Sequence, residues 1–292
     1  MPSLSSRIVA FILRTTGVFR KQFSGGPEFP KYQAKALAAP IAPPAKLSRK
    51  CDVTQSAFQG RDVWEFAPKD SSPSATILYW HGGGYVYPPG NPHWGFMATM
   101  AATYGWRVIA PCYKLAPFAE VEEVTSFALD LWRDLLARSD GPIIMGGDSA
   151  GGGLAAATVM LARDAGLPLP AKLILICPWV DTEACHPDQI AIEPRDAILT
   201  LRGVREAGAL YAGAVGSRDP RVSPIHGSWE GLPPILMFGG GDDILVTDAR
   251  AVKTKLPLAD YHELAGMIHD WPIFTFPESR GAQAQMARFA TG

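Results

Sequence analysis

The sequence predicts an α/β fold with a mainly parallel central sheet of about eight strands, flanked by helices on both faces. Three observations carry this prediction. Strand and helix patterns alternate repeatedly from residue 76 onward. Residues 172–177 form an uninterrupted apolar run, which is typical of a central strand covered on both faces. The stretch from Gly146 to Gly152 joins a short apolar strand directly to a helix rich in Ala and Leu.

Length and composition restrict the class of protein. The 292 residues are 47% hydrophobic, so the chain can bury a large core as one domain, or as one domain with an insertion. The formal net charge of -1 and the lack of any long run of Lys or Arg argue against nucleic acid as a partner. Neither of the glycine motifs that bind dinucleotides or nucleoside triphosphates occurs, and we expect no cofactor. We expect a monomer or a homodimer.

The four cysteines, Cys51, Cys112, Cys177 and Cys185, show no C-x-x-C spacing. We interpret them as buried reduced thiols, neither a disulfide framework nor a metal site. This cysteine usage predicts a reducing compartment, which for this chain means the cytoplasm.

The first residues predict an amphipathic helix over 5–14, capped by Ser5 or Ser6. Ile8, Phe11 and Ile12 fall on one face of it, and Phe19 is a further candidate for this face. Its apolar run is too short to span a membrane, so we expect no stable membrane insertion. The helix either packs over the functional site as part of a lid, which we favour, or lies on a membrane surface. A connector rich in Pro and Ala follows at residues 38–46.

The first half of the folded body begins with two alternating patterns, which predict antiparallel strands at the edge of the sheet. Asn91-Pro92 favours a helix start, and apolar residues at helical spacing indicate a helix that covers one sheet face. In order, the predicted elements are strands 53–58, 62–67 and 76–80, helix 91–103, strand 106–110, helix 120–137, strand 142–145 and helix 154–165.

The second half contains an interruption. After strand 172–177, residues 183–218 hold helical patterns over 195–201 and 204–214 where a strand is due, which predicts an insertion above the strand ends. The alternation then resumes with strand 234–238, helix 247–255, strand 260–264 and a terminal helix over 278–289.

A nucleophile is predicted where the strand turns into the helix. Gly147-x-Ser149-x-Gly151 fits the G-x-S-x-G elbow, a strained turn that lifts a Ser hydroxyl above the carboxyl end of a sheet. Both glycines are needed because a side chain at either position would collide with the neighbouring strand or helix.

A serine hydroxyl needs a base, and the base needs an orienting acid. Of the six histidines, His269 directly follows the last predicted strand, and loops after parallel strands meet at the edge where the elbow opens. The acid is expected in the loop after strand 234–238, which offers Asp242 and Asp243. Asp248 is expected to cap or open the following helix.

Donors for a negatively charged oxygen are predicted at two places. His81-Gly82-Gly83-Gly84 follows a strand, and its glycines leave backbone N–H groups free to approach a substrate. The N–H of Ala150, one residue after the nucleophile, is the third expected donor.

Several motifs together resemble the hormone-sensitive lipase family (family IV) of carboxylesterases, which has the alpha/beta-hydrolase fold. They are HGGGY at 81–85, YKLAP at 113–117, GDSAGG at 147–152, PWVD at 178–181, DPRVSP at 219–224, Asp243-x-Leu245 and Gly266-Met267-x-His269. The resemblance covers residues 50–292. It implies that Ser149, Asp243 and His269 are the catalytic residues and that Gly83, Gly84 and Ala150 form the oxyanion hole. Cys112 and Phe118 stand where the family usually has acidic residues, which concerns the shape of the loop beside the site.

The resemblance also implies the domain organisation. Residues 1–45 match an N-terminal cap segment and connector, residues 183–218 match an inserted helical cap segment, and residues 46–182 with 219–292 match the catalytic domain. Four aromatic residues are candidates for the lining of an apolar substrate pocket: Tyr85, Trp94, Trp179 and Tyr211.

The sequence therefore predicts a serine carboxylesterase that acts on a small-molecule substrate, a short-chain or aryl carboxylic ester. Two alternatives remain open. The same triad could hydrolyse amides or remove acetyl groups, and the scaffold could serve as a non-catalytic ligand-binding protein.

Overall fold

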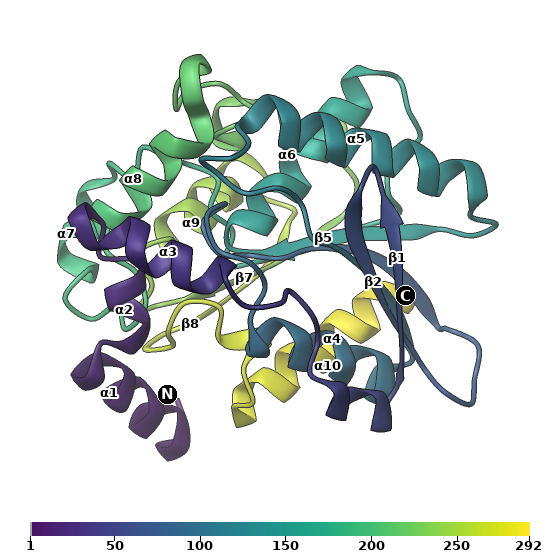
Figure 1. The fold of residues 1–292 in the computed structure, drawn as a ribbon, viewed down its shortest axis with the longest axis horizontal. Helices are drawn as coiled ribbons and strands as arrows, with labels where there is room; N and C mark the ends of the chain where they lie inside the picture. Colours follow the sequence, from purple (N-terminus) through teal and green to yellow (C-terminus); the bar gives the residue numbers. More distant parts are fainter. Residues whose placement is uncertain (1) are drawn as a thin grey trace.

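The computed structural model describes residues 2–292 and forms an eight-stranded sheet with helices on both faces (Figure 1). The strand order is β1-β2-β4-β3-β5-β6-β7-β8. The strands are β1 (Asp52–Phe58), β2 (Arg61–Ala67), β3 (Ala75–Trp80), β4 (Trp106–Pro111), β5 (Ile143–Asp148), β6 (Leu173–Ile176), β7 (Ile235–Gly240) and β8 (Asp260–Leu264). The helices are α1 (Leu4–Thr16), α2 (Val18–Gln22), α3 (Phe29–Leu37), α4 (Asn91–Tyr104), α5 (Val121–Arg138), α6 (Ala150–Asp164), α7 (Pro187–Ile192), α8 (Leu201–Ala212), α9 (Val246–Lys255) and α10 (Pro277–Thr291).

The sheet is parallel from β4 to β8, which confirms the predicted architecture. Every residue of β5, β6 and β7 is buried, because helices cover both faces of the sheet there. The two first strands are antiparallel, as expected, but only β1 lies at the edge. The prediction that β2 is also an edge strand is wrong, because β2 pairs with β4 on its other side.

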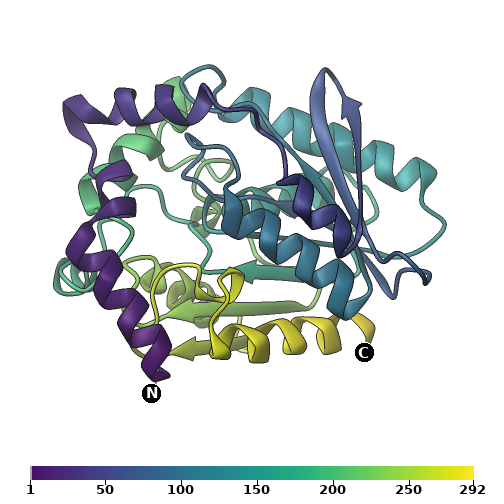
Figure 2. The ribbon, with the colours of Figure 1, turned by 60° about the horizontal axis from the view of Figure 1, so that its bottom comes forward.

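The helices form two layers around the sheet. α4 contacts α10, and α5 contacts α6. Figure 2 shows the first pair on one face of the sheet and the second pair on the other. On α5 the apolar positions at helical spacing, such as Val124, Leu131 and Leu135, are buried as predicted. The strand ends and their loops are thereby fixed between two packed layers.

The structure differs from the sequence-based expectation at both segments above the strand ends. No helix forms over 195–201; α7 forms instead, with Pro187 in its first turn and His186 as its N-cap. The Asp196 side chain competes with the helical backbone for hydrogen bonds. Its carboxylate accepts the backbone N–H groups of Ile198 and Leu199 and stabilises a turn there. Near the N-terminus, α2 and α3 are additional helices that the sequence patterns did not predict.

These two segments pack on one another. The Thr200 hydroxyl donates to the carbonyl of Phe23, and the backbone N–H of Gly26 donates to the carboxylate of Glu206. Arg20 donates to the carbonyl of Asp196. The N-terminal helices therefore lie against the 183–218 segment and not free in solvent. Among residues 2–292, no helix combines the length and apolar character needed to cross a membrane.

Candidate active site

Ser149 lies at the sharp turn between β5 and α6, as predicted. Its backbone angles are φ 51° and ψ -122°, a conformation that non-glycine residues rarely adopt. A Cβ built on Gly151 would lie 2.0 Å from the carbonyl oxygen of Trp80, and one on Gly147 would lie 2.4 Å from Gly151. The two glycines are therefore required by space, and the packing around them holds Ser149 in its strained position.

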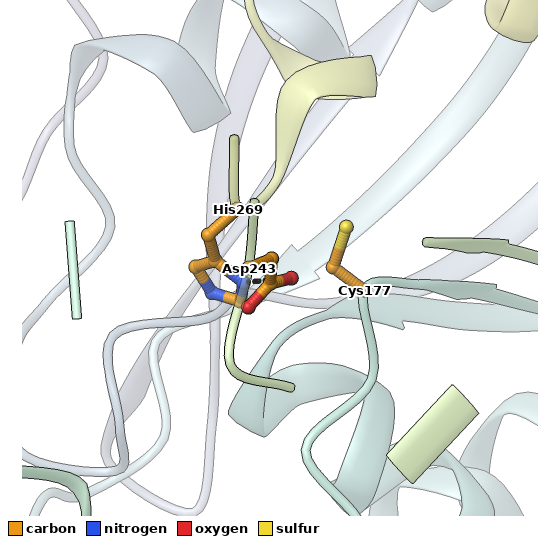
Figure 3. A group of neighbouring side chains, drawn as sticks. All are labelled: Cys177, Asp243 and His269. Atoms are coloured by element: carbon orange, nitrogen blue, oxygen red, sulfur yellow. Dashed lines mark hydrogen bonds and ion pairs between the residues drawn. The ribbon is translucent and has the colours of Figure 1, made fainter. Parts of the chain in front are cut away.

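His269 and Asp243 lie in the loops that follow β8 and β7, at the same edge of the sheet as Ser149. The Nδ1 atom of His269 is 2.8 Å from the Oδ2 atom of Asp243, and both side chains are buried (Figure 3). The other carboxylate oxygen of Asp243 accepts the backbone N–H of Leu245 at 2.8 Å. This arrangement fixes the carboxylate and, through it, the orientation of the imidazole.

Ser149 and His269 line the same cavity, which has a volume of about 130 Å³. No hydrogen bond joins the two side chains in the part of the chain that the structure describes. The Nε2 atom of His269 instead lies 3.1 Å from the Oδ2 atom of Asp270. The structure thus brings Asp243 and His269 into contact and places Ser149 in the cavity that His269 borders.

The HGGG segment also borders this cavity. Gly83 lines the main cavity, and Gly84 lines a smaller one together with Ser149. Both glycines have positive φ, and a Cβ on Gly83 would lie 2.4 Å from the carbonyl oxygen of Tyr87. The N–H of Gly82 is already donated to Asp148, whereas Ala150 begins α6 and has a first-turn N–H without an intrahelical acceptor.

A buried carboxylate inside the GDSAGG motif, for which the sequence predicts no role, connects the elbow to the HGGG segment. Asp148 accepts hydrogen bonds from the Tyr79 hydroxyl at 2.6 Å, the Gly82 N–H at 3.1 Å and the Nε2 atom of His93 at 3.0 Å. Burial alone would raise the pKa of Asp148, but His93 and Tyr79 outweigh it and hold that pKa below its usual value. Asp148 therefore fixes the spacing between the nucleophile and the HGGG loop.

A second buried carboxylate stabilises the loop after β7, which carries Asp243. Asp196 comes from the 183–218 segment, and its Oδ2 atom accepts the backbone N–H of Ile244, the residue after Asp243. Burial, with a contribution from the neighbouring Asp243, raises the pKa of Asp196 to about 7. The 183–218 segment thus contacts the loop that carries Asp243 directly, a link between residues far apart in sequence.

The other acids near this loop have structural roles. Asp242 is partly exposed and forms ion pairs with Arg195 at 3.0 Å and Arg14 at 3.4 Å. Of the two expectations for Asp248, the structure bears out that it opens α9, since it lies in the first turn of this helix, and contradicts that it caps the helix, since the N-cap is Leu245. Its carboxylate accepts the backbone N–H groups of Val180 and Asp181.

The four aromatic candidates for the pocket have different surroundings. Tyr85 and Tyr211 stack on each other in the interior with ring centroids 3.6 Å apart. Trp94 is buried against Phe66, and Trp179 lines the smaller cavity beside Ser149. The cavity that contains Ser149 and His269 is lined by a different set of apolar residues. They come from α2 and the residue after it, the loop after the HGGG segment, the 183–218 segment and the loop after His269: Phe19, Phe23, Tyr87, Ile198, Ile273 and Phe274. The amphipathic pattern predicted Phe19 on a helix face, but no sequence signal placed these residues together.

Asp270 is a further residue at the site that the motifs did not identify. It is buried, lines the cavity with Ser149, and has φ 55°. Its Oδ1 atom is buried without a hydrogen-bond partner among residues 2–292. Burial raises the pKa of Asp270 to about 7, against the opposing effect of His269. Burial lowers the pKa of His269, but Asp243 and Asp270 outweigh burial and raise it well above its usual value.

The contact between Asp270 and His269 leads to a prediction for the Asp270→Asn variant. If neutral His269 accepts a proton during the reaction, a raised pKa puts the acidic limb of kcat/KM above pH 6.5 in the wild type. Asn tolerates the left-handed backbone but lacks the charge, so the variant should lower the pKa of His269 and move this limb to lower pH by about one unit. The measurement is a pH profile of both enzymes on one ester. If the acidic limb of the kcat/KM profile does not move in Asp270→Asn, or moves to higher pH, Asp270 does not raise the pKa of His269.

Three side chains lie close enough together for a metal ion to bind between them: Cys177, Asp243 and His269 (Figure 3). Their donor atoms are within 4.8 Å of one another. The donor chemistry does not fit a cation. Nδ1 of His269 and Oδ2 of Asp243 are hydrogen-bonded to each other. Burial, followed by Asp243, raises the pKa of Cys177 well above its usual value, which favours the neutral thiol over a thiolate ligand. The group is better described as a hydrogen-bonded acid–base pair beside a buried thiol.

Comparisons with known proteins agree with this geometry. The model of a family described as the alpha/beta hydrolase fold matches residues 77–273. LipR of Mycobacterium tuberculosis is 32% identical, over 86% of this chain and 84% of its own length. A Streptomyces hygroscopicus protein named acetyl-hydrolase is also 32% identical, over 74% of this chain and 76% of its own length.

A solved structure extends the similarity to the whole chain. It is described as an esterase from the bacterial hormone-sensitive lipase family, and it superposes with a TM-score of 0.84. The two sequences are 27% identical, and the match covers 100% of this chain and 99% of that chain. The chain therefore belongs to the alpha/beta-hydrolase fold family, in the hormone-sensitive lipase branch of carboxylic ester hydrolases.

Proposed function

We propose that this carboxylesterase uses Ser149 as the nucleophile, His269 as the general base and Asp243 as the acid that orients the base. The observation that carries the proposal is the buried 2.8 Å contact between His269 and Asp243 beside the strained Ser149 in one cavity. Contacts between a nucleophile and its base are often loose without substrate, so a small rotation of the imidazole from Asp270 toward Ser149 would complete the triad.

The proposed reaction has two stages. In the first, Oγ of Ser149 attacks the ester carbonyl carbon while its proton passes to Nε2 of His269. The C–O bond to the alcohol then breaks, and the alcohol leaves with that proton, which gives an acyl-enzyme. In the second stage, water attacks the acyl carbon, gives a proton to Nε2 of His269, and the released Ser149 oxygen takes that proton back. The carboxylic acid leaves, and the enzyme is regenerated.

Backbone N–H groups are proposed to stabilise the negative oxygen in both stages. Gly83, Gly84 and Ala150 have suitable positions, because the first two belong to the segment that faces Ser149 and the third begins α6. Such donors lower the energy of the tetrahedral intermediate more than that of the planar ester, and this difference accelerates the reaction.

The cavity favours a small substrate. Its volume of about 130 Å³ is comparable to that of a protein cavity that binds benzene, about 150 Å³. Its lining is largely apolar and aromatic, which suits a short acyl chain or an aryl group. We therefore propose short-chain or aryl esters as substrates. A series of p-nitrophenyl esters from acetate to decanoate tests this size limit. Values of kcat/KM should fall for the long chains, and a maximum at decanoate would contradict the proposal.

Hydrolysis of acetyl groups or amides is the second candidate function, favoured by the similarity to the Streptomyces acetyl-hydrolase. A matched pair of substrates, phenyl acetate and acetanilide, separates the two. We expect a higher kcat/KM for the ester, because phenoxide is the better leaving group. A preference for the amide, after correction for the uncatalysed rates, would support the deacetylase function.

Three organisational features complete the proposal. Residues 1–45 and 183–218 form the cap, and residues 46–182 with 219–292 form the catalytic domain, which the mutual packing of the two cap segments supports. We infer a cytoplasmic location because all four cysteines are free thiols. Cys51, Cys112 and Cys177 are buried, but the expectation that Cys185 is also buried is wrong, because its side chain is exposed. The protein acts on a small-molecule ester as a monomer or homodimer.

A further inference from the structure

Large apolar side chains are exposed in an unusual concentration on the first two helices. The structure describes nine exposed large hydrophobic residues along residues 2–292, and five of them fall between residues 4 and 18. They are Leu4, Ile8, Phe11, Ile12 and Val18, with exposed fractions of 71%, 49%, 64%, 50% and 52%. Single exposed apolar residues are common on protein surfaces, but a contiguous group is not.

The inner face of α1 is already packed, so the exposed face is a separate surface. Ser6 and Ala10 are buried against the body of the protein. The carboxylate of Glu278, at the start of α10, accepts hydrogen bonds from Ser3 and Ser6 and fastens the first turn of the helix. The fold therefore holds α1 in place without using its exposed side.

The exposed residues form one stripe along the helix. Leu4, Ile8 and Phe11 are spaced by four and three positions, which places them on one side of α1, with Ile12 next to Ile8. We call these four residues the α1 outer face. The four side chains expose on the order of 500 Å² of apolar surface, which lies in the range where patches on soluble proteins mark protein or membrane contacts.

The charge around this face has one sign. Residues 2–27 include four basic residues and no Asp or Glu. Arg14 and Arg20 are engaged with the 183–218 segment, whereas Arg7 and Lys21 have exposed side chains. The nearest acids on packed elements are occupied, since Glu278 binds Ser3 and Ser6, and Asp242 pairs with Arg14. The surface thus combines exposed apolar side chains with free positive charge.

We propose that the α1 outer face docks on an anionic lipid surface. Apolar side chains would enter the boundary between headgroups and acyl chains, and Arg7 and Lys21 would contact anionic headgroups. A second copy of this chain fits less well, because a symmetric contact would bring Arg7 of each copy toward the same basic surface of the other. The exposed area also falls short of the roughly 800 Å² that each partner contributes to a stable protein interface.

Docking would act on the part of the cap that borders the cavity. Gly17 is the only residue between α1 and α2, and Phe19 and Phe23, in and just after α2, line the cavity that contains Ser149. A lipid surface held by α1 would therefore lie next to one wall of the cavity. This consequence depends on the proposed function, whereas the docking itself does not.

The test is co-sedimentation of the full chain with lipid vesicles at low salt. We expect binding to vesicles of phosphatidylglycerol and phosphatidylcholine in equal parts, and at least tenfold weaker binding to phosphatidylcholine alone. The double variant Ile8→Ser/Phe11→Ser should lose at least tenfold in partitioning. Arg7→Gln/Lys21→Gln should remove the preference for the anionic vesicles. Leu258→Ser is the matched control, because Leu258 is 100% exposed but lies outside the α1 outer face, and this variant should bind like the wild type.

Circular dichroism and the melting temperature check that each variant is folded, and hydrolysis of a soluble ester should be unchanged because none of these residues lines the cavity. Failure of the wild type to bind anionic vesicles, or equal binding by Ile8→Ser/Phe11→Ser, overturns the proposal. Sedimentation velocity tests whether a second copy of this chain, and not a lipid surface, covers the α1 outer face. A wild-type dimer that Ile8→Ser/Phe11→Ser dissociates would also overturn the proposal and assign the face to a second copy. The binding result needs no catalysis, so it stands or fails separately from the proposed function.

Discussion

Replacing Ser149 with Ala should lower kcat for p-nitrophenyl acetate by about 10⁵–10⁶-fold. In the proposed mechanism the Oγ atom of Ser149 forms the acyl-enzyme, and neither His269 nor any other side chain at the cavity can take its place at the elbow. Residual hydrolysis would come from the oxyanion donors and the cavity alone. Steady-state kinetics on freshly purified variant, with active-site titration of the wild type, give the comparison.

The Ser149→Ala variant should remain folded, because Ala has the same Cβ and the strained backbone at this position is held by its neighbours. The side chain of Ser149 makes no hydrogen bond within residues 2–292, so its loss leaves no buried partner unsatisfied. A melting temperature close to that of the wild type is the control. A folded Ser149→Ala enzyme with wild-type turnover would show that the nucleophile lies elsewhere.

The second large effect is expected when Asp243 is replaced. Asp243→Asn should lower kcat by about 10³–10⁴-fold, because an amide cannot stabilise the imidazolium and can hold His269 in the wrong tautomer. The exposed fraction of Asp243 is 0%, and its Oδ2 atom lies 2.8 Å from the Nδ1 atom of His269. Measurements of kcat at several pH values distinguish a loss of base function at His269 from a shift in the pKa of His269.

The neighbouring acid provides the matched control. Asp242→Asn removes the same charge one residue away, but Asp242 forms ion pairs with Arg14 and Arg195 at the surface of the loop. Exposed ion pairs contribute about 0–1 kcal/mol, so this variant should keep kcat within a few-fold of the wild type. If Asp242→Asn is the damaging substitution and Asp243→Asn is not, the acid has been assigned to the wrong residue.

The parts of the site that the sequence could predict are those fixed by local backbone geometry. Gly147 and Gly151 indicate a turn that only glycine can make, and this turn presents Ser149, midway between them, to the cavity. The place of His269 after the last strand predicts its role, because loops after parallel strands meet at one edge. The choice between Asp242 and Asp243 was open from the residues alone and depended on the family resemblance; the structure brings Asp243 to His269.

The parts that the sequence could not predict depend on contacts between distant segments. Asp196 stabilises a turn inside a stretch whose periodicity resembles a helix, and it reaches the catalytic loop only in the folded chain. Asp270 directly follows His269, yet nothing in the sequence indicates that its carboxylate turns back to Nε2. Phe19 and Phe23 line the cavity because α2 folds over the strand ends, an arrangement that no local pattern encodes.

The convergence of Ser149, His269 and Asp243 is tested most directly by covalent labelling with a fluorophosphonate, followed by mass spectrometry of the modified peptide. One adduct per chain is expected, on Ser149, with a labelling rate that falls at least 10³-fold in His269→Asn and that declines as pH is lowered through the raised pKa of His269. An adduct on another residue, or a labelling rate that His269→Asn leaves unchanged, would contradict the proposed triad.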